Sequence, residues 1–317
     1  DVPVLIFVLK RILAAVPVLL IVTVLSFSMI HLIPGDAAVV AAGDNASADQ
    51  VAATRAQLGL DRNIVVQYLS WVGSLATGDF GTSLLSSHRN IDAILEALPV
   101  TLSLAFVALS WSLVVGVVAG VLAGLRRGTW IDRTLTGLTT LGISMPSFWL
   151  GMILVTLFSL QFRLFPATGY SPLGEGVVSW FSHLALPAFA LGTVTAAEIA
   201  RQARAGVVDV LERDYIRTAT AKGLPRWKVV MKHTTKNAAV PVVTVFGLQT
   251  AALIGGAVIV EQVFGMPGLG SVALKAILER DFPVIQAFVV VITLFVLIVN
   301  LLVDVSYAYF NPKARQA

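Results

Sequence analysis

The sequence predicts an all-α integral membrane protein with six transmembrane helices, and three observations lead to this fold class. Of the 317 residues, 57% are hydrophobic and only 13% are charged, whereas soluble domains usually have about 25% charged residues. Six apolar stretches are each long enough to cross a bilayer as a helix, which takes about 20 residues. These stretches show no long alternation of polar and apolar residues, so we do not expect a β-barrel.

The six predicted spans are joined by polar connections. They cover residues 12–33, 99–125, 135–162, 183–199, 239–260 and 284–309. The first span follows Lys10 and Arg11 and resembles a signal peptide in outline. Because its apolar run is long and no small-residue cleavage site ends it, we expect an uncleaved first span. Residues 1–317 are predicted to form a single transmembrane domain.

Basic residues are distributed unevenly between alternate connections. Most of the 22 lysines and arginines lie before the first span, between spans two and three, between spans four and five, or after the last span. Cytoplasmic loops carry such an excess of positive charge. The sequence therefore predicts that both termini and the connection 201–237 lie in the cytoplasm.

The connection 34–98 is predicted to be an external loop that contains short helices. Ser47 and Gln50 have the spacing of a capping box, and Gly59 suits the end of a helix. These signals predict a helix over residues 48–58. The helices of this loop have two possible roles that the sequence does not separate. They either cap the bundle only, or they have a functional role in sealing an outer gate or in meeting an external partner.

Further short helices are predicted outside the spans. One covers residues 64–75 and is amphipathic, and one covers 91–98 and bends at Pro99 into the second span. A third covers 271–278 within the glycine- and proline-rich connection 261–283, which either dips back toward a pathway or forms a surface loop. The apolar stripe of the 64–75 helix is predicted to consist of Val65, Tyr68, Leu69 and Val72.

The candidate functional site lies in the connection 201–237. Apolar residues before Gly223 recur at steps of three and four, which predicts one helical stripe; they are Val207, Val208, Val210, Leu211, Tyr215, Ile216 and Ala219. Gly223 suits the left-handed end of that helix, and Pro225 suits the first turn of a second helix that reaches about Asn237. A capped helical hairpin is stiffer than a loop, so a partner that binds it can transmit its movement to the rest of the chain.

Several functional classes are excluded or disfavoured by composition. The chain has no cysteine, which excludes disulfides and thiolate chemistry, and its scattered histidines are not expected to bind a metal. No Gly-Lys dipeptide occurs, so the chain has no phosphate loop. Ionisable residues are absent from the middle of the spans, which disfavours an ion-coupled carrier. Acidic residues offset the basic ones in 201–237, so we expect lipid contact but no nucleic-acid binding.

The span from Asp214 to Pro241 resembles the EAA loop of ABC-importer permeases, whose glycine corresponds to Gly223. More narrowly, Tyr215–Leu224, followed by His233, Asn237, Ala238 and Pro241, is similar to the loop of the dipeptide/oligopeptide/nickel permease family, in its first permease subunit. The likeness extends over nearly the whole chain, through Ile33–Asp36, Leu58–Asp61, Gly78–Ser83, Leu98–Leu102, His183–Pro187, Glu261–Phe264, Pro267–Gly270 and Tyr307–Pro312. The general motif begins with glutamate where Thr218 stands, so Arg217 or Asp214 could supply charge toward an ATPase instead.

The resemblance implies a type I ABC importer permease fold and a non-catalytic subunit in the cell inner membrane. It implies that the chain forms half of a translocation pathway with a second homologous permease. Two cytoplasmic ATP-binding subunits and an external substrate-binding protein or lipoprotein would complete the importer. ATP and Mg²⁺ would be bound by the ATPase subunits, so we expect no cofactor in this chain. The ATPase-coupling residues would be Asp214, Tyr215, Arg217, Thr218, Ala219, Thr220, Ala221, Lys222, Gly223 and Leu224.

Dipeptides or oligopeptides are the cargo that the resemblance implies. Nickel complexes, glutathione or another small solute are the alternatives within the same family. An ion-coupled secondary transporter is a distant alternative, because such carriers usually have internal repeats and we find none in the sequence.

Overall fold

The computed structural model describes residues 2–32, 37–42, 46–57, 59–86, 88–223 and 235–310. Within these ranges the elements are helices, apart from one isolated bridge between Thr82 and Arg89. In chain order the helices are α1 (Val2–Leu32), α2 (Ala37–Ala42), α3 (Ala48–Gln57), α4 (Ile64–Ala76), α5 (Asn90–Leu125), α6 (Trp130–Ser144), α7 (Ser147–Leu154), η1 (Val155–Gln161), η2 (Leu173–Glu175), α8 (Val177–Leu211), α9 (Asp214–Ala221), α11 (Thr235–Val263), α12 (Leu269–Glu279) and α13 (Phe282–Phe310).

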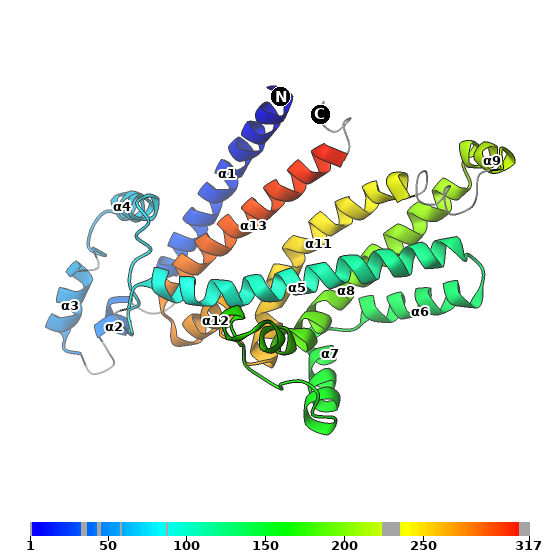
Figure 1. Cartoon of the computed structure of the whole chain (residues 1–317). Coiled ribbons are helices and arrows are strands. Elements are labelled where there is room, and N and C mark those ends of the chain that lie inside the picture. The colour runs from blue at the N-terminus through cyan, green and yellow to red at the C-terminus, as the bar shows by residue number, and fades with distance from the viewer. Residues whose placement is uncertain are drawn as a thin grey trace.

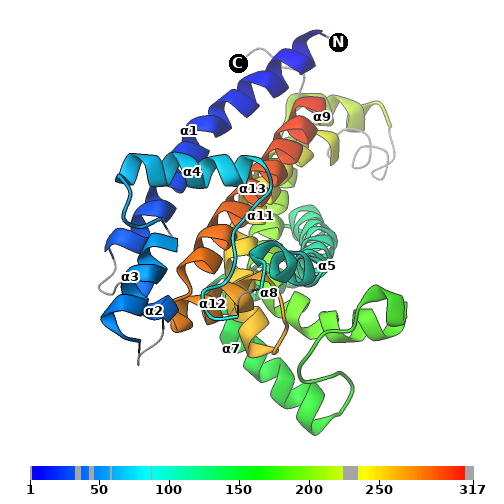
Figure 2. The same cartoon turned by 90° about the vertical axis from the view of Figure 1, so that its left-hand side faces the viewer.

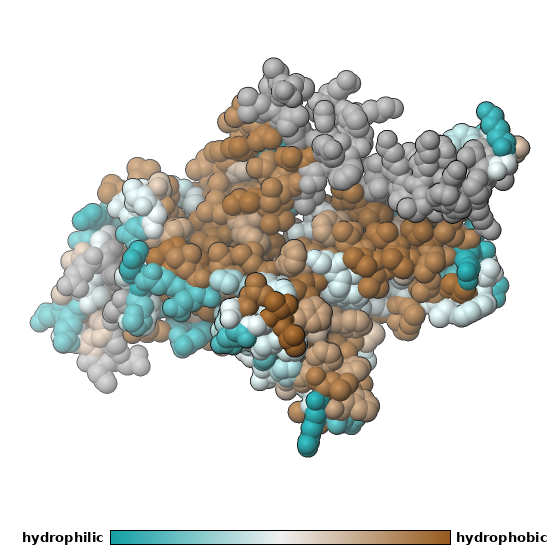
Figure 3. Space-filling view, in the orientation of Figure 1, coloured by the Kyte–Doolittle hydropathy of each residue, from teal (hydrophilic) through white to brown (hydrophobic). Residues whose placement is uncertain are grey.

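The long helices confirm the predicted membrane architecture. Among the described residues, α1, α5, α8, α11 and α13 contain segments long and apolar enough to cross a bilayer, and α6 with α7 and η1 makes a sixth if the bent pair is one span. Helices α1 and α13 lie side by side, and α8 packs against both α5 and α11 (Figure 1). Hydrophobic residues cover the middle of the molecule, and hydrophilic residues gather around α3 and α4 at one end and near α9 at the other (Figure 3).

The third predicted span, 135–162, is not one straight helix. Helix α6 ends at Ser144, α7 begins after Pro146, and the two parts meet at an angle of 105°. Proline has no backbone N–H and clashes with the preceding turn, so it ends the α6 ladder here. The pair is therefore a broken span or a re-entrant segment, and the sequence prediction of a continuous helix was wrong in this detail.

The capping box and the glycine stop that predict α3 are confirmed. The Ser47 N–H donates to Gln50 Oε1 at 2.8 Å, and the Gln50 N–H donates to Ser47 Oγ at 3.3 Å. Gly59 has a φ of 65°, a left-handed conformation that glycine adopts readily. Helix α3 covers Ala48–Gln57, and Leu58, the predicted last residue, lies outside the described residues.

Helix α4 forms where the sequence predicts it, but of its predicted apolar stripe Tyr68 makes the contact with α1, while Val65 and Leu69 do not. Val65 and Leu69 are 59% and 62% exposed. The packing side chains are Tyr68, whose hydroxyl lies 2.9 Å from that of Thr23 in α1, and Trp71, whose ring lies against Phe27. The helix thus lies across α1 (Figure 2).

Two other expected helix bounds need correction, those of one short helix and of one membrane span. The predicted helix 91–98 is the first part of α5, which continues through Pro99 without ending. Neighbouring helices allow proline inside membrane helices because they satisfy the freed carbonyl. The predicted span 183–199 is likewise only the middle of α8, which extends to Leu211.

Helix α5 contacts α8 through a row of glycines. A methyl group added to Gly116 would lie 2.7 Å from the Ala196 carbonyl oxygen, and one added to Gly124 would lie 2.8 Å from Cβ of Val207. Between them, Gly120 meets the backbone of Ala200 even more closely. Small residues at such spacing let membrane helices approach until their backbones touch, so the two helices form one tightly packed pair.

Glu261 links helices α5, α11 and α12. This fully buried residue of α11 accepts hydrogen bonds from Thr101 Oγ1 of α5 at 2.6 Å and from the Ser271 N–H of α12 at 3.1 Å. Thr101 Oγ1 in turn accepts the Leu269 N–H at 2.8 Å. The connection 261–283 therefore packs into the bundle at its start and is not a plain surface loop there.

We predict that Gly120→Val prevents α5 from packing on α8. The added side chain would overlap the α8 backbone, and overpacking of this kind costs about 1–3 kcal/mol or more. Thermal unfolding of the purified protein should show a clear loss of stability. Gly137→Val in α6 is the matched control, because a Cβ there meets no atom within 4 Å; equal losses in both variants would contradict the close contact.

We predict that Thr101→Val destabilises the outer end of the bundle by about 1–3 kcal/mol, because the buried Glu261 carboxylate and the Leu269 N–H each lose a partner. Thr250→Val is the control, since Thr250 is also buried but its hydroxyl donates only to the Phe246 carbonyl of its own helix. Denaturant unfolding of both variants measures the difference, and a control that is equally destabilised would refute the role of the Glu261 contact.

Candidate coupling site

The predicted helical stripe is divided between two helices. Helix α8 ends at Leu211, and the chain turns at Glu212 and Arg213 before α9 begins at Asp214. The Arg213 N–H donates to the Val210 carbonyl at 3.1 Å, which closes the turn. The expectation of one continuous stripe was therefore wrong, because the first part packs inside the bundle while the second belongs to a separate helix.

Apolar contacts across this turn hold α9 against the end of α8. Ile216 is only 5% exposed and packs on Val210 and Leu211. Tyr215, which the stripe also included, is exposed instead. Helix α9 thus projects from the end of α8 as a short helix with a fixed contact at its base. This end of the molecule lies far from α2, α3 and α4 (Figure 1).

Gly223 follows α9 with a φ of 78°. A Cβ at this position would meet no atom within 4 Å, so backbone conformation rather than space requires glycine. The Lys222 N–H donates to the Thr218 carbonyl at 3.1 Å, and Thr218 Oγ1 donates to the Asp214 carbonyl at 3.0 Å. The predicted end of a helix at Gly223 is confirmed.

The predicted coupling residues lie on one exposed segment. Side chains of Asp214, Tyr215, Thr218, Ala221 and Lys222 are exposed. Arg217, Ala219 and Thr220 belong to α9 by position. Leu224 and most of the second predicted helix, up to Asn237, lie outside the described residues.

A group of polar contacts that sequence reasoning missed lies on α8, two helical turns before that helix ends. Asp132 of α6 accepts two hydrogen bonds from Arg204 of α8, from Nε at 2.6 Å and from Nη2 at 2.9 Å. It also accepts the Gly128 N–H at 2.9 Å and Thr136 Oγ1 at 3.3 Å. We call these four residues the α6–α8 link. Asp132 is the single acidic residue in the segment 126–133, which also contains Arg126, Arg127 and Arg133. This pattern could have indicated an ion pair.

A second ion pair joins the turn between α5 and α6 to the residue that follows α8. Arg127, between α5 and α6, pairs with Glu212. Both side chains are exposed, so this contact contributes less to stability than the buried Asp132 pair. Together the two pairs connect the α5–α6 turn to the base of α9.

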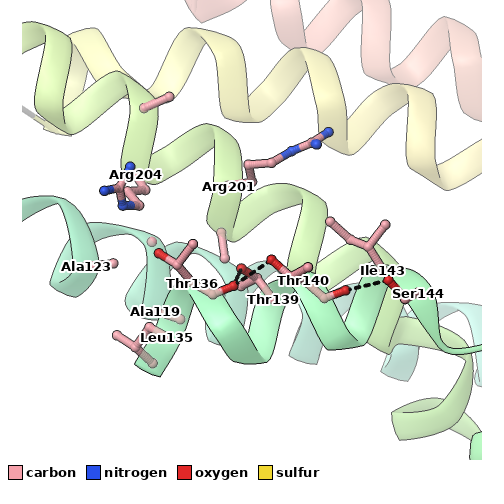
Figure 4. A pocket seen from close by; sticks show the side chains of 13 residues that line it. Ala119, Ala123, Leu135, Thr136, Thr139, Thr140, Ile143, Ser144, Arg201 and Arg204 are labelled. Carbon is pink, nitrogen blue, oxygen red and sulfur yellow. Dashed lines mark hydrogen bonds between the residues drawn. The ribbon is translucent and has the colours of Figure 1, made fainter. Parts of the chain in front are cut away.

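A cavity of about 290 Å³ lies between α5, α6 and α8 beside this link. In Figure 4, Thr136, Thr140 and Ser144 of α6 lie on one side of the cavity, and Arg201 and Arg204 of α8 lie on the other. Arg201 pairs with Glu198 at 2.6 Å and Arg204 pairs with Asp132. Hydroxyls at Thr140 and Ser144 donate to carbonyls of their own helix. The polar side chains of this mixed lining therefore already have partners, so the cavity offers little to a charged ligand.

Comparison with known proteins identifies the family. The family described as "Binding-protein-dependent transport system inner membrane component" matches residues 116–316, and its N-terminal counterpart matches residues 4–105. The chain belongs to this family. It is a multi-pass permease subunit of an ABC importer in the inner membrane, and permeases of this family work with ATPase and substrate-binding partners.

Relatives place the permease in the dipeptide/oligopeptide family that its motifs resemble. It is 42% identical over 308 residues to a putative peptide transport system permease protein of Brucella abortus (strain 2308), covering 97% of this chain and 98% of the relative. It is 41% identical over 309 residues to the glutathione transport system permease protein GsiC of Escherichia coli (strain K12), covering 98% of each.

A solved structure supports the same fold. The permease resembles an inward-facing structure of the MetNI methionine ABC transporter with a TM-score of 0.58 and 18% identity, over 70% of this chain and 97% of that chain. The predicted ABC importer permease fold is confirmed.

We predict that Gly223→Val impairs transport while Gly223→Asn largely retains it. A β-branched residue in the left-handed region is strained by about 1–2 kcal/mol, whereas asparagine tolerates that region. Uptake by cells that carry each variant, normalised to the amount in the membrane, measures the effect. Gly128, with a φ of 80° and equally open surroundings, offers a matched Val/Asn comparison for the α5–α6 turn.

Proposed function

We propose that this chain forms half of the translocation pathway of an ATP-driven importer for peptides and receives force from ATPase subunits through α9. The observation that carries the proposal is the exposed helix α9, which is held at its base by Ile216 and ended by the left-handed Gly223. A partner that binds this helix can move α8, and with it the bundle.

Peptide cargo is supported by the relatives. One is named a peptide permease and another a glutathione permease, and glutathione is itself a tripeptide. Both match along almost the whole chain, so the likeness covers the spans as well as the coupling segment. A nickel complex or another small solute is the alternative within the family.

The chain itself is proposed to be non-catalytic. It has no Gly-Lys dipeptide, which a phosphate loop requires, so ATP and Mg²⁺ belong to the ATPase subunits. We propose a complex of this permease, a second homologous permease, two ATPase subunits and an external substrate-binding protein or lipoprotein.

The proposed orientation has both termini and the coupling segment in the cytoplasm. Arginines around α9 and the α5–α6 turn support it, among them Arg126, Arg127, Arg133 and Arg213, because cytoplasmic connections are rich in Lys and Arg. The ATPase subunits would then meet α9 on the side where ATP is found.

We predict that Ala221→Trp abolishes ATP-driven peptide uptake without lowering the amount of permease in the membrane. Ala221 is an exposed small residue of α9, and a large ring there keeps the partner from the helix backbone. Ala76→Trp is the matched control, because Ala76 is exposed at the end of the outer helix α4. Normal uptake by Ala221→Trp would contradict the coupling role of α9.

Copurification and reconstitution test the assembly and its cargo. The tagged permease should bring down a second permease and ATPase subunits, and the reconstituted complex should concentrate labelled dipeptides or oligopeptides only when ATP is hydrolysed. Uphill transport by the chain alone would contradict the proposal, as would a complex that carries a nickel chelate but no peptide.

A further inference from the structure

We propose that Asp132 and Arg204 are positioning residues that make α6 and the α5–α6 turn move together with α8, and hence with α9, as one rigid body during transport. This inference rests on the proposed coupling role of α9. It adds a second element, α6, that receives the movement of the coupling helix.

The geometry of the α6–α8 link is that of a rigid contact. Asp132 is nearly buried, with 6% of its side chain exposed, and the planar guanidinium of Arg204 reaches both of its oxygens. Two parallel hydrogen bonds of this kind fix orientation as well as distance. Gly128 and Thr136 satisfy the same carboxylate from the turn and from the next turn of α6, so one side chain joins three segments.

Close contacts of α8 with α6 and with α5 restrict how far the link can shift, although the cavity lies beside it. Further along α6, a methyl group added to Gly142 would lie 3.3 Å from Cβ of Ala197 in α8. At the other side, Gly120 and Gly124 of α5 meet the α8 backbone and Val207. The link therefore closes one end of a three-helix unit whose members already touch.

The position of the link makes this unit mechanically relevant. Arg204 lies two helical turns before the end of α8, and Glu212, which pairs with Arg127 of the α5–α6 turn, lies two residues before α9. A displacement of α9 is thus delivered to α6 through two polar contacts. Helix α6 ends at the bend of Met145 and Pro146, where the 105° break lets α7 change its angle to α6.

The first test compares Asp132→Asn and Arg204→Lys with Glu279→Gln in the assembled importer. The first two variants remove the bidentate pair, while Glu279 forms only an exposed 4.0 Å pair with Lys275. We expect peptide transported per ATP hydrolysed to fall about tenfold in the link variants, the scale of one lost coupling contact, with ATP hydrolysis retained and the control unchanged. A parallel loss of hydrolysis, transport and assembled complex would mean that the pair only stabilises the fold, and would overturn the proposal.

The second test uses the absence of native cysteines. Gly142→Cys with Ala197→Cys places two Cβ atoms close to the separation of about 3.5–4.5 Å found in disulfides. If α6 and α8 move as one body, oxidation should form the bond and leave ATP-driven transport unchanged, as in the single-cysteine controls. Transport that is lost on oxidation and restored by a reductant would overturn the proposal, and so would failure of the bond to form.

The outcomes separate this proposal from the proposed function. If Ala221→Trp transports normally, α9 is not the coupling helix and the larger proposal fails. If Ala221→Trp blocks transport while the oxidised double-cysteine protein is inactive or Asp132→Asn remains fully coupled, α9 keeps its role and only the rigid unit with α6 is refuted.

Discussion

Backbone contact between α5 and α8 is the constraint on which the positions of the other elements depend. Lipid tails are as apolar as leucine, so helices in a bilayer associate through close packing rather than through the hydrophobic effect. The glycines at 116, 120 and 124 remove the side chains that would keep the two helices apart. Because α8 runs unbroken to Leu211, this contact also determines where α9 leaves the bundle.

Features encoded by neighbouring residues could be predicted from the sequence. The Ser47–Gln50 capping box and the left-handed glycines at 59 and 223 are local, since each depends on a few adjacent residues. The membrane spans are also local in this sense, because hydrophobic length alone indicates them. The exposed position of the coupling segment followed from its charge and its helix-ending glycine.

Features that depend on distant contacts could not be predicted. Asp132 and Arg204 are 72 residues apart in the chain, and the residues adjacent to each in the sequence do not indicate that the two side chains pair. Val207 and Ile216 belong to one periodic pattern, yet Val207 packs against Gly124, whereas Ile216 lies beyond the turn at Glu212 and packs on Val210. Pro99 and Pro146 give the same local signal, but tertiary packing lets α5 continue through the first while the chain bends at the second.

The polar link adds a unique register that the glycine row lacks, because it fixes α6 on α8 and the short turn 126–129 joins α6 to α5. Small residues recur every four positions on α5, and alanines recur in the same way on α8 at 196 and 200, so a shift by one turn would bring similar surfaces together. An apolar pair in place of Asp132 and Arg204 could stabilise the fold as well or better, because desolvation offsets much of the attraction in a buried ion pair. A bidentate pair, however, forms in only one alignment of the helices. Its presence next to the coupling segment is thus better explained by a need for fixed alignment under load than by stability alone.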